Sequence, residues 1–209
     1  MEQSRVTGLG VQEIARKSPG AGITALQMVS ALRNGVIIPL HKQQAERQKT
    51  LTSLIHADKG GLIYQPIIGI HKDVAQIDFA SMYPSIIVNH NISPETLENE
   101  QVEPGLIPQA LKPILEKRLR MKEMIQHLDE RDCQVPALKE RSAALKWLLV
   151  VCFGYLGYKN ARFGQIESHE AVTKISRELL LQAKEVAEDM GFTVLHMYVD
   201  SLFVQRAGT

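Results

Sequence analysis

Two aspartates close apolar, strand-like stretches, and they are the residues of this sequence best suited to metal chemistry. Asp78 follows the run Val74-Ala75-Gln76-Ile77, and Asp200 interrupts the apolar segment of residues 194–204. A carboxylate at the end of a buried strand lies where a core stops and a cleft begins. Taken alone, each aspartate is more typical of a helix cap or a turn. Brought together, the two carboxylates supply the oxygen ligands that divalent cations prefer.

Three basic residues are spaced to bind an anion. Arg118 and Lys122 lie four residues apart, so they share one face of a helix, and Lys146 lies on the next predicted helix. If the two helices fold back on each other, the three cations converge on one anionic ligand. A run of charges on a helix is more often a solvated face, and Lys146 alone is typical of an exposed helix lysine.

The hydrophobic pattern predicts the elements that position these residues. Apolar residues at three- to four-residue spacing predict helices over residues 108–128 and 137–151, joined by a short turn and therefore antiparallel. Residues 166–190 form the clearest amphipathic helix, which Gly191 ends. Residues 74–78, expected to be buried, and 192–198 are predicted strands. The fold class is α+β.

The stretch that begins at Asp78 has a specific pattern. Residues 78–87 read Asp-x-x-Ser-Met-Tyr-Pro-Ser-Ile-Ile, which resembles motif A of the family B DNA polymerases, usually Asp-x-x-Ser-Leu-Tyr-Pro-Ser-Ile. The resemblance covers about residues 60–206. It implies a polymerase palm, an antiparallel sheet backed by helices, with an inserted antiparallel helical hairpin as the fingers subdomain. The thumb and exonuclease domains are expected to lie outside this chain.

The implied domain organisation has four segments. Residues 1–59 lead into the palm, and residues 60–104 form the palm with motif A. Residues 105–158 form the fingers hairpin with motif B, and residues 159–209 return to the palm with a long helix and the motif C hairpin.

Motif B carries the three cations but departs from the family elsewhere. The family pattern is Arg-x-x-x-Lys followed by Lys-x-x-x-Asn-Ser-x-Tyr-Gly, and it grips the triphosphate of the incoming nucleotide. Here Val150 and Val151 stand in place of Asn and Ser, and Phe153 stands in place of Tyr. Because a valine side chain has no hydrogen-bonding group, the resemblance implies altered sensing of the base-paired nucleotide.

Motif C is interpreted as a shortened hairpin. The family pattern Tyr-Gly-Asp-Thr-Asp-Ser is matched by Tyr198-Val199-Asp200-Ser201, two residues shorter, without the first carboxylate. Since strand side chains alternate with period two, the deletion keeps every flanking residue on its face. Asp200 then matches the second Asp. In the family, this Asp and the motif A Asp, which Asp78 matches, are the principal metal ligands.

The resemblance implies a two-metal mechanism at these residues. Two Mg²⁺ ions, with Mn²⁺ as an alternative, lie roughly 3.5 to 4 Å apart between Asp78 and Asp200. The backbone carbonyl of Phe79 completes the metal ligands. One ion lowers the pKa of the primer 3′-hydroxyl, and the other neutralises the triphosphate.

The same resemblance implies a nucleotide site and its substrates. The backbone amides of Ser81 and Met82 contact phosphates, and the ring of Tyr83 excludes a 2′-hydroxyl. Lys146 takes part in catalysis by stabilising phosphate charge. The full implied nucleotide-binding set is Ser81, Met82, Tyr83, Arg118, Lys122, Lys146 and Phe153. The implied partners are primer-template DNA, deoxynucleoside triphosphates and the remaining polymerase domains or subunits.

Composition narrows the class without choosing it. The 209 residues are 44% hydrophobic and 22% charged, with a net charge of +1, which is typical of one or two globular units. No apolar run reaches the ~20 residues of a membrane span, and no secretion signal opens the chain. Two cysteines without zinc spacing favour a reducing compartment, so an intracellular location is expected, cytoplasmic and nucleoid-associated if the source is prokaryotic.

Three functions remain open at this point. The first is the catalytic core of a DNA-directed DNA polymerase, transferring deoxynucleotides to a primer 3′-hydroxyl. The second is a degenerate polymerase kept for DNA binding or assembly, which Val150, Val151 and the variant hairpin favour. The third is a metal-dependent nuclease, which has no need for the basic hairpin or the tyrosine gate.

Overall fold

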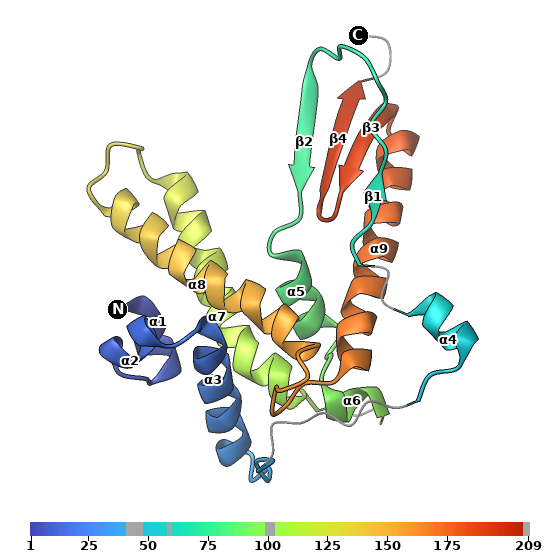
Figure 1. The fold of residues 1–209 in the computed structure, drawn as a ribbon. Helices are drawn as coiled ribbons and strands as arrows, with labels where there is room; N and C mark the ends of the chain where they lie inside the picture. Colours follow the sequence, from blue (N-terminus) through green and yellow to red (C-terminus); the bar gives the residue numbers. More distant parts are fainter. Residues whose placement is uncertain (41–47, 58–59, 99–102, 207–209) are drawn as a thin grey trace. The chain divides into compact units, whose positions relative to one another are not determined.

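The computed structural model describes residues 1–40, 48–57, 60–98 and 103–206, and the described chain divides into two compact units (Figure 1). The first unit combines Met1–Arg47 with Tyr83–His169, and the second combines Gln48–Met82 with Glu170–Thr209. In chain order the elements are α1 (Glu2–Thr7), α2 (Val11–Arg16), α3 (Pro19–Arg33), α4 (Leu51–His56), β1 (Ile63–Tyr64), β2 (Val74–Asp78), α5 (Met82–Asn89), α6 (Pro94–Glu98), α7 (Leu106–His127), α8 (Gln134–Leu156), α9 (Ile166–Asp189), β3 (Phe192–Tyr198) and β4 (Ser201–Arg206).

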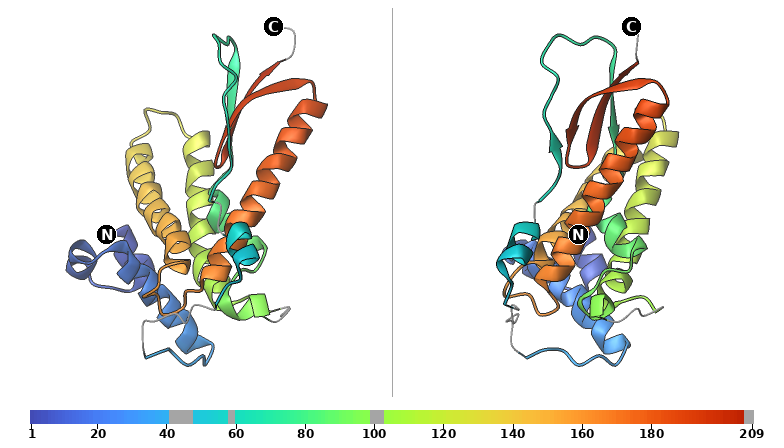
Figure 2. Two further views of the ribbon diagram at one scale, coloured as in Figure 1. Left: turned by 45° about the vertical axis from the view of Figure 1, so that its right-hand side comes forward. Right: turned by 90° about the vertical axis from the view of Figure 1, so that its right-hand side faces the viewer.

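The first unit is built around the helical hairpin of α7 and α8, against which α3 packs (Figures 1 and 2). The two predicted helices are confirmed, and both are longer than predicted. Pro108 lies in the first turn of α7, and Pro113 lies inside the helix on its exposed side. The apolar stripe of α7 is buried, as its three- to four-residue spacing requires, together with Ile23 of α3 and Leu148 of α8.

The second unit contains a four-stranded antiparallel sheet in the order β1-β3-β4-β2. The register pairs Val194 with Val204 and Met197 with Leu202, and all four side chains are buried on one face. An irregularity in the register between Val194 and His196 allows two residues three apart to share that face. The coarse expectation of an α+β fold with an antiparallel sheet is thereby confirmed.

The strand that ends at Asp78 is confirmed, but its predicted burial is wrong. Every residue of β2 is exposed, because the strand order places β2 at one edge of the sheet. Ala75 and Ile77 lie opposite the buried Val204 and Leu202, yet Ile77 remains 51% exposed. Its apolar residues therefore extend the buried face of β4 to the edge strand, where they are exposed to solvent.

The long helix predicted after the hairpin is also confirmed as α9. Gly191 follows it with φ of 82°, a left-handed conformation that favours glycine and lets the chain reverse into β3. In the described part of the chain, no helix combines the length and the apolar content that crossing a bilayer requires.

Candidate active site

The structure brings Asp78 and Asp200 to the same end of the sheet. Asp78 is the last residue of β2 and pairs with Ser201, the first residue of β4. The hydroxyl of Ser201 donates to Asp78 Oδ1 at 2.8 Å, and the backbone N–H of Phe79 donates to the carbonyl oxygen of Asp200 at 2.9 Å. Two chain segments separated by more than a hundred residues are thus joined at the two aspartates.

A tight turn presents Asp200. Tyr198 pairs with Ser201 across the hairpin, so Val199 and Asp200 form a two-residue loop. Val199 has φ of 58°, a left-handed conformation that is strained for a β-branched residue. Its N–H donates to the carbonyl of Leu62 at 2.9 Å, which ties the turn to the segment before β1. The position of Asp200 is therefore determined by the surrounding structure rather than by the preference of the turn residues.

The donor set at this end of the sheet is made of oxygens. Asp78 is exposed and Asp200 is half-buried, so neither residue is closed off from solvent. Within the described ranges, no group of three or more histidine, cysteine or acidic side chains is placed to hold a metal. The two carboxylates, with the adjacent Phe79 carbonyl as a further donor, suit a hard cation that keeps several waters, as Mg²⁺ does.

The two residues predicted to contact phosphates, Ser81 and Met82, lie where the turn after β2 leads into α5. Ser81 has φ of 55°, and Met82 is the first residue of α5 and is buried. This left-handed residue comes three positions after Asp78, and the helix begins at the next residue. Their predicted contacts through backbone amides stay a prediction.

Tyr83 and Phe153, predicted separately from motifs A and B, lie in contact. Their rings stack with centroids 4.2 Å apart and planes 25° apart. The ring of His169, from the first turn of α9, stacks on Phe153 at 4.2 Å and 20°. Sequence reasoning missed His169, since it belongs to no motif and no periodicity points to it.

The three predicted cations differ in exposure. Arg118 is only 9% exposed and lies on the buried face of α7 with Leu115 and Met121. Burial lowers the pKa of the Arg118 guanidinium from its ordinary value, because desolvation disfavours the charged form. Lys122 is half-buried, and Lys146 lies on the exposed face of α8. Their convergence on one anion stays a prediction.

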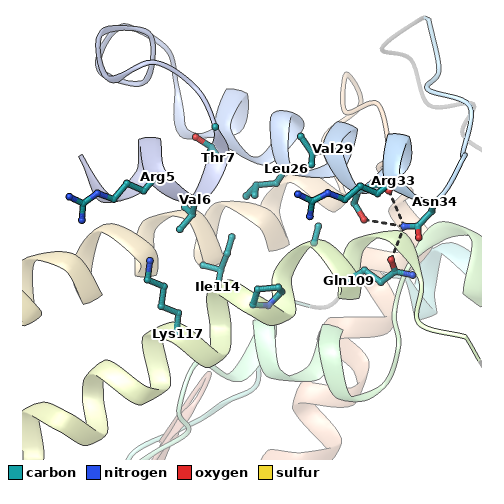
Figure 3. A pocket seen from close by; sticks show the side chains of 14 residues that line it. Arg5, Val6, Thr7, Leu26, Val29, Arg33, Asn34, Gln109, Ile114 and Lys117 are labelled. Carbon is teal, nitrogen blue, oxygen red and sulfur yellow. Dashed lines mark hydrogen bonds between the residues drawn. The ribbon is translucent and has the colours of Figure 1, made fainter.

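A cavity of about 620 Å³ lies between α1, α3 and α7, and no predicted site residue lines it (Figure 3). Its basic lining residues are Arg5, Arg33 and Lys117. Lys117 and Arg5 already face the buried carboxylate of Glu2, at 2.6 and 3.8 Å. On its other side, the amide of Asn34 donates to the side-chain oxygen of Gln109 at 2.7 Å.

Comparison with known protein families identifies the family of this chain. The sequence pattern of DNA polymerase family B matches residues 20–104 and 98–203. The chain belongs to DNA polymerase family B.

Two curated relatives and one solved structure illustrate the similarity. DNA polymerase 2 of Saccharolobus solfataricus is 39% identical over 98% of this chain and 32% of its own length. The DNA polymerase of Archaeoglobus fulgidus is 31% identical over 99% of this chain and 27% of its own length. The structure of the family B DNA polymerase from Pyrobaculum calidifontis matches 99% of this chain and 29% of its own, with a TM-score of 0.70 and 31% identity. The chain therefore spans about a third of these relatives or less.

Proposed function

We propose that this chain supplies the palm and fingers of a DNA-directed DNA polymerase, which transfers deoxynucleotides to a primer 3′-hydroxyl under the direction of a template. One observation carries the proposal: in a family B chain, Asp78 and Asp200 lie at adjoining ends of the paired strands β2 and β4. The partners are primer-template DNA, deoxynucleoside triphosphates and the remaining polymerase domains, the thumb and the exonuclease.

The metal ligands follow from the donor set. Asp78, Asp200 and the Phe79 carbonyl would hold divalent cations, which when bound polarise the attacking hydroxyl and neutralise the leaving phosphates. Ser201 orients Asp78 by donating to its Oδ1, which leaves Oδ2 and the second lone pair of Oδ1 for a cation. The Phe79 N–H fixes the Asp200 backbone in the same way.

The nucleotide is held by residues of the hairpin and of α5. Lys146 projects from the exposed face of α8 beside Val150, so its ammonium is available to a phosphate. Lys122 and Arg118 supply further positive charge from α7. Tyr83, held by its stack on Phe153, places its ring under the sugar and leaves no room for a 2′-hydroxyl.

The motif C hairpin admits a second alignment. The six residues His196 to Ser201 equal the family pattern in length, and read without a gap they place Tyr198 at the first carboxylate. The regular pairing of β3 with β4 from His196 to Tyr198 supports this alignment. Both alignments keep Asp200 as the motif C carboxylate, so the ligand assignment does not depend on the choice.

Primer extension by the complete polymerase tests the proposal. Asp78→Asn and Asp200→Asn should each reduce Mg²⁺-dependent extension by at least about a hundredfold, because each removes a charge from a metal ligand. Asp73→Asn is the matched control, since Asp73 precedes the other end of β2, and it should retain activity. Equal activity in all three variants contradicts the assignment.

A catalytically degenerate polymerase is the second candidate. Val150 is exposed on the same face of α8 as Lys146, where the family pattern has a polar residue. An apolar residue at that position offers the nucleotide no hydrogen bond. Wild-type protein that binds primer-template DNA but shows no extension with Mg²⁺ or Mn²⁺ would establish this alternative.

A further inference from the structure

The aromatic contact at Tyr83 continues to a third ring outside the polymerase motifs. Phe153 has Tyr83 on one side and His169 on the other, with both centroid distances at 4.2 Å and both interplanar angles at or below 25°. The three rings come from three helices, α5, α8 and α9, and all belong to the first unit. This three-ring stack has Phe153 at its centre.

His169 is held in place by two local features. Its Nδ1 lies 3.3 Å from the carbonyl oxygen of Phe153, within hydrogen-bond distance, so the imidazole is tied to the residue on which it stacks. Gly157 faces the same ring, and a Cβ at that position would approach the imidazole Cγ and Nδ1 to 3.1 and 3.2 Å. A side chain at residue 157 would therefore press on the imidazole, and glycine leaves it room.

Phe153 depends on these contacts more than a tyrosine would. A phenylalanine ring has no hydroxyl, so packing alone fixes its orientation. A ring packed on one face only can tilt or slide, whereas partners on both faces confine it. Because Tyr83 stacks directly on Phe153, any freedom of Phe153 is passed to Tyr83.

We propose that His169 is a positioning residue for sugar discrimination, acting through Phe153 on the ring of Tyr83. The proposal rests on the proposed function, in which Tyr83 excludes ribonucleotides. His169 touches neither the nucleotide nor the reacting atoms in this mechanism. Replacing His169 should therefore change the ratio of kcat/KM between deoxynucleotide and ribonucleotide rather than the rate of the chemical step.

The test compares two apolar replacements of similar size, which differ in their ability to stack. His169→Leu fills the space without an aromatic face, and His169→Phe keeps the face but loses the contact of Nδ1 with the Phe153 carbonyl. The measurement is kcat/KM for a deoxynucleotide and for the matching ribonucleotide in primer extension by the complete polymerase. His127→Leu, at the exposed end of α7, is the control.

In His169→Leu, discrimination against the ribonucleotide should fall about three- to tenfold, the range expected from one lost aromatic pair. His169→Phe should stay close to the wild type, because the ring face is retained, and His127→Leu should not change the ratio. Unchanged discrimination in His169→Leu overturns the proposal, and so does an equal loss in His169→Phe.

A second measurement separates this proposal from the gate on which it rests. Fluorine NMR of protein labelled with 3-fluorotyrosine reports the surroundings of Tyr83, whose signal is identified by its disappearance in Tyr83→Phe. The Tyr83 signal should shift in His169→Leu and not in His127→Leu, and no shift overturns the positioning role. If Tyr83→Ala leaves discrimination against ribonucleotides unchanged while the Tyr83 signal still shifts in His169→Leu, then His169 positions Tyr83 but Tyr83 does not exclude ribonucleotides. That result contradicts the proposed sugar gate and, with it, the effect of His169 on discrimination.

Discussion

At Val199, the turn that presents Asp200 requires a left-handed backbone conformation that valine disfavours. With φ of 58°, it adopts a conformation that costs an L-residue roughly 1–2 kcal/mol and costs glycine little. Val199→Gly should therefore leave the free energy of unfolding unchanged or raise it by up to about 1 kcal/mol, after the entropy of the added glycine is subtracted. Thermal or urea unfolding measures the difference.

Thr193→Gly is the matched control for Val199→Gly. Thr193 lies on β3 of the same hairpin, is exposed and has an ordinary φ, so glycine there brings only its entropic cost. We expect a loss of about 0.5–1 kcal/mol in the control. A loss of the same size in Val199→Gly would mean that the turn is not strained. Because Asp200 is the next residue, primer extension by Val199→Gly in the complete polymerase also tests whether a looser turn weakens the metal binding proposed for Asp200.

At the scale of elements, a buried carboxylate joins α1 to both helices of the hairpin. The Glu2 side chain is 4% exposed and contacts Lys117 of α7 at 2.6 Å and Arg141 of α8 at 2.9 Å. Glu2→Gln should cost about 2–3 kcal/mol of unfolding free energy, below the 3–5 kcal/mol of a fully buried pair because both cations are partly exposed. Glu13→Gln, which breaks an exposed pair with Lys17, should cost less than about 0.5 kcal/mol.

The same carboxylate predicts a pH dependence. Burial raises the pKa of Glu2, but the hydrogen bonds and charges of Lys117 and Arg141 outweigh burial and lower the pKa below its ordinary value of 4.5. Because the pKa is lower in the folded state, the ionised carboxylate of Glu2 stabilises the fold, and this stabilisation is fully present above pH 4.5. It is lost as the pH falls through the lowered pKa. The stability gap between the wild type and Glu2→Gln should thus be constant from pH 5.5 to 7 and shrink below about 4.5. A gap that grows on acidification contradicts this account.

Helices and strands were predictable where the spacing of apolar residues within one segment is enough to define them. The stripe of α9, the hairpin helices and the strand ending at Asp78 follow from local spacing, and the structure confirms them. The exposure of β2 was not predictable, because an edge position depends on strand order. The contacts of Glu2 and the stack on His169 join segments distant in sequence, and neither residue belongs to a motif. The adjacency of Asp78 and Asp200 was inferred from family resemblance, since periodicity alone does not pair β2 with β4.

At the scale of the whole molecule, one segment rich in exposed apolar residues runs from β1 into β2. This apolar segment is defined by Ile63, Ile67, Ile68, Ile70, Val74 and Ile77, all exposed in the described structure. Monomeric proteins seldom leave large apolar patches in water, because each exposed side chain forgoes the gain of burial. These six side chains therefore make the segment a candidate surface for binding hydrophobic molecules.

The double substitution Ile68→Lys and Ile70→Lys tests that surface. These side chains are 98% and 97% exposed, so charge should not disturb packing, and the unfolding free energy should change by less than about 0.5 kcal/mol per site. Fluorescence of an apolar dye such as ANS should fall in the variant, because the two most exposed apolar side chains of the segment become charged. Leu32→Lys, which alters one exposed leucine of α3 in the first unit, should lower the fluorescence less. Equal falls in fluorescence would mean that the dye binds scattered apolar side chains rather than the apolar segment. A large loss of stability in the double variant would mean that Ile68 and Ile70 are packed.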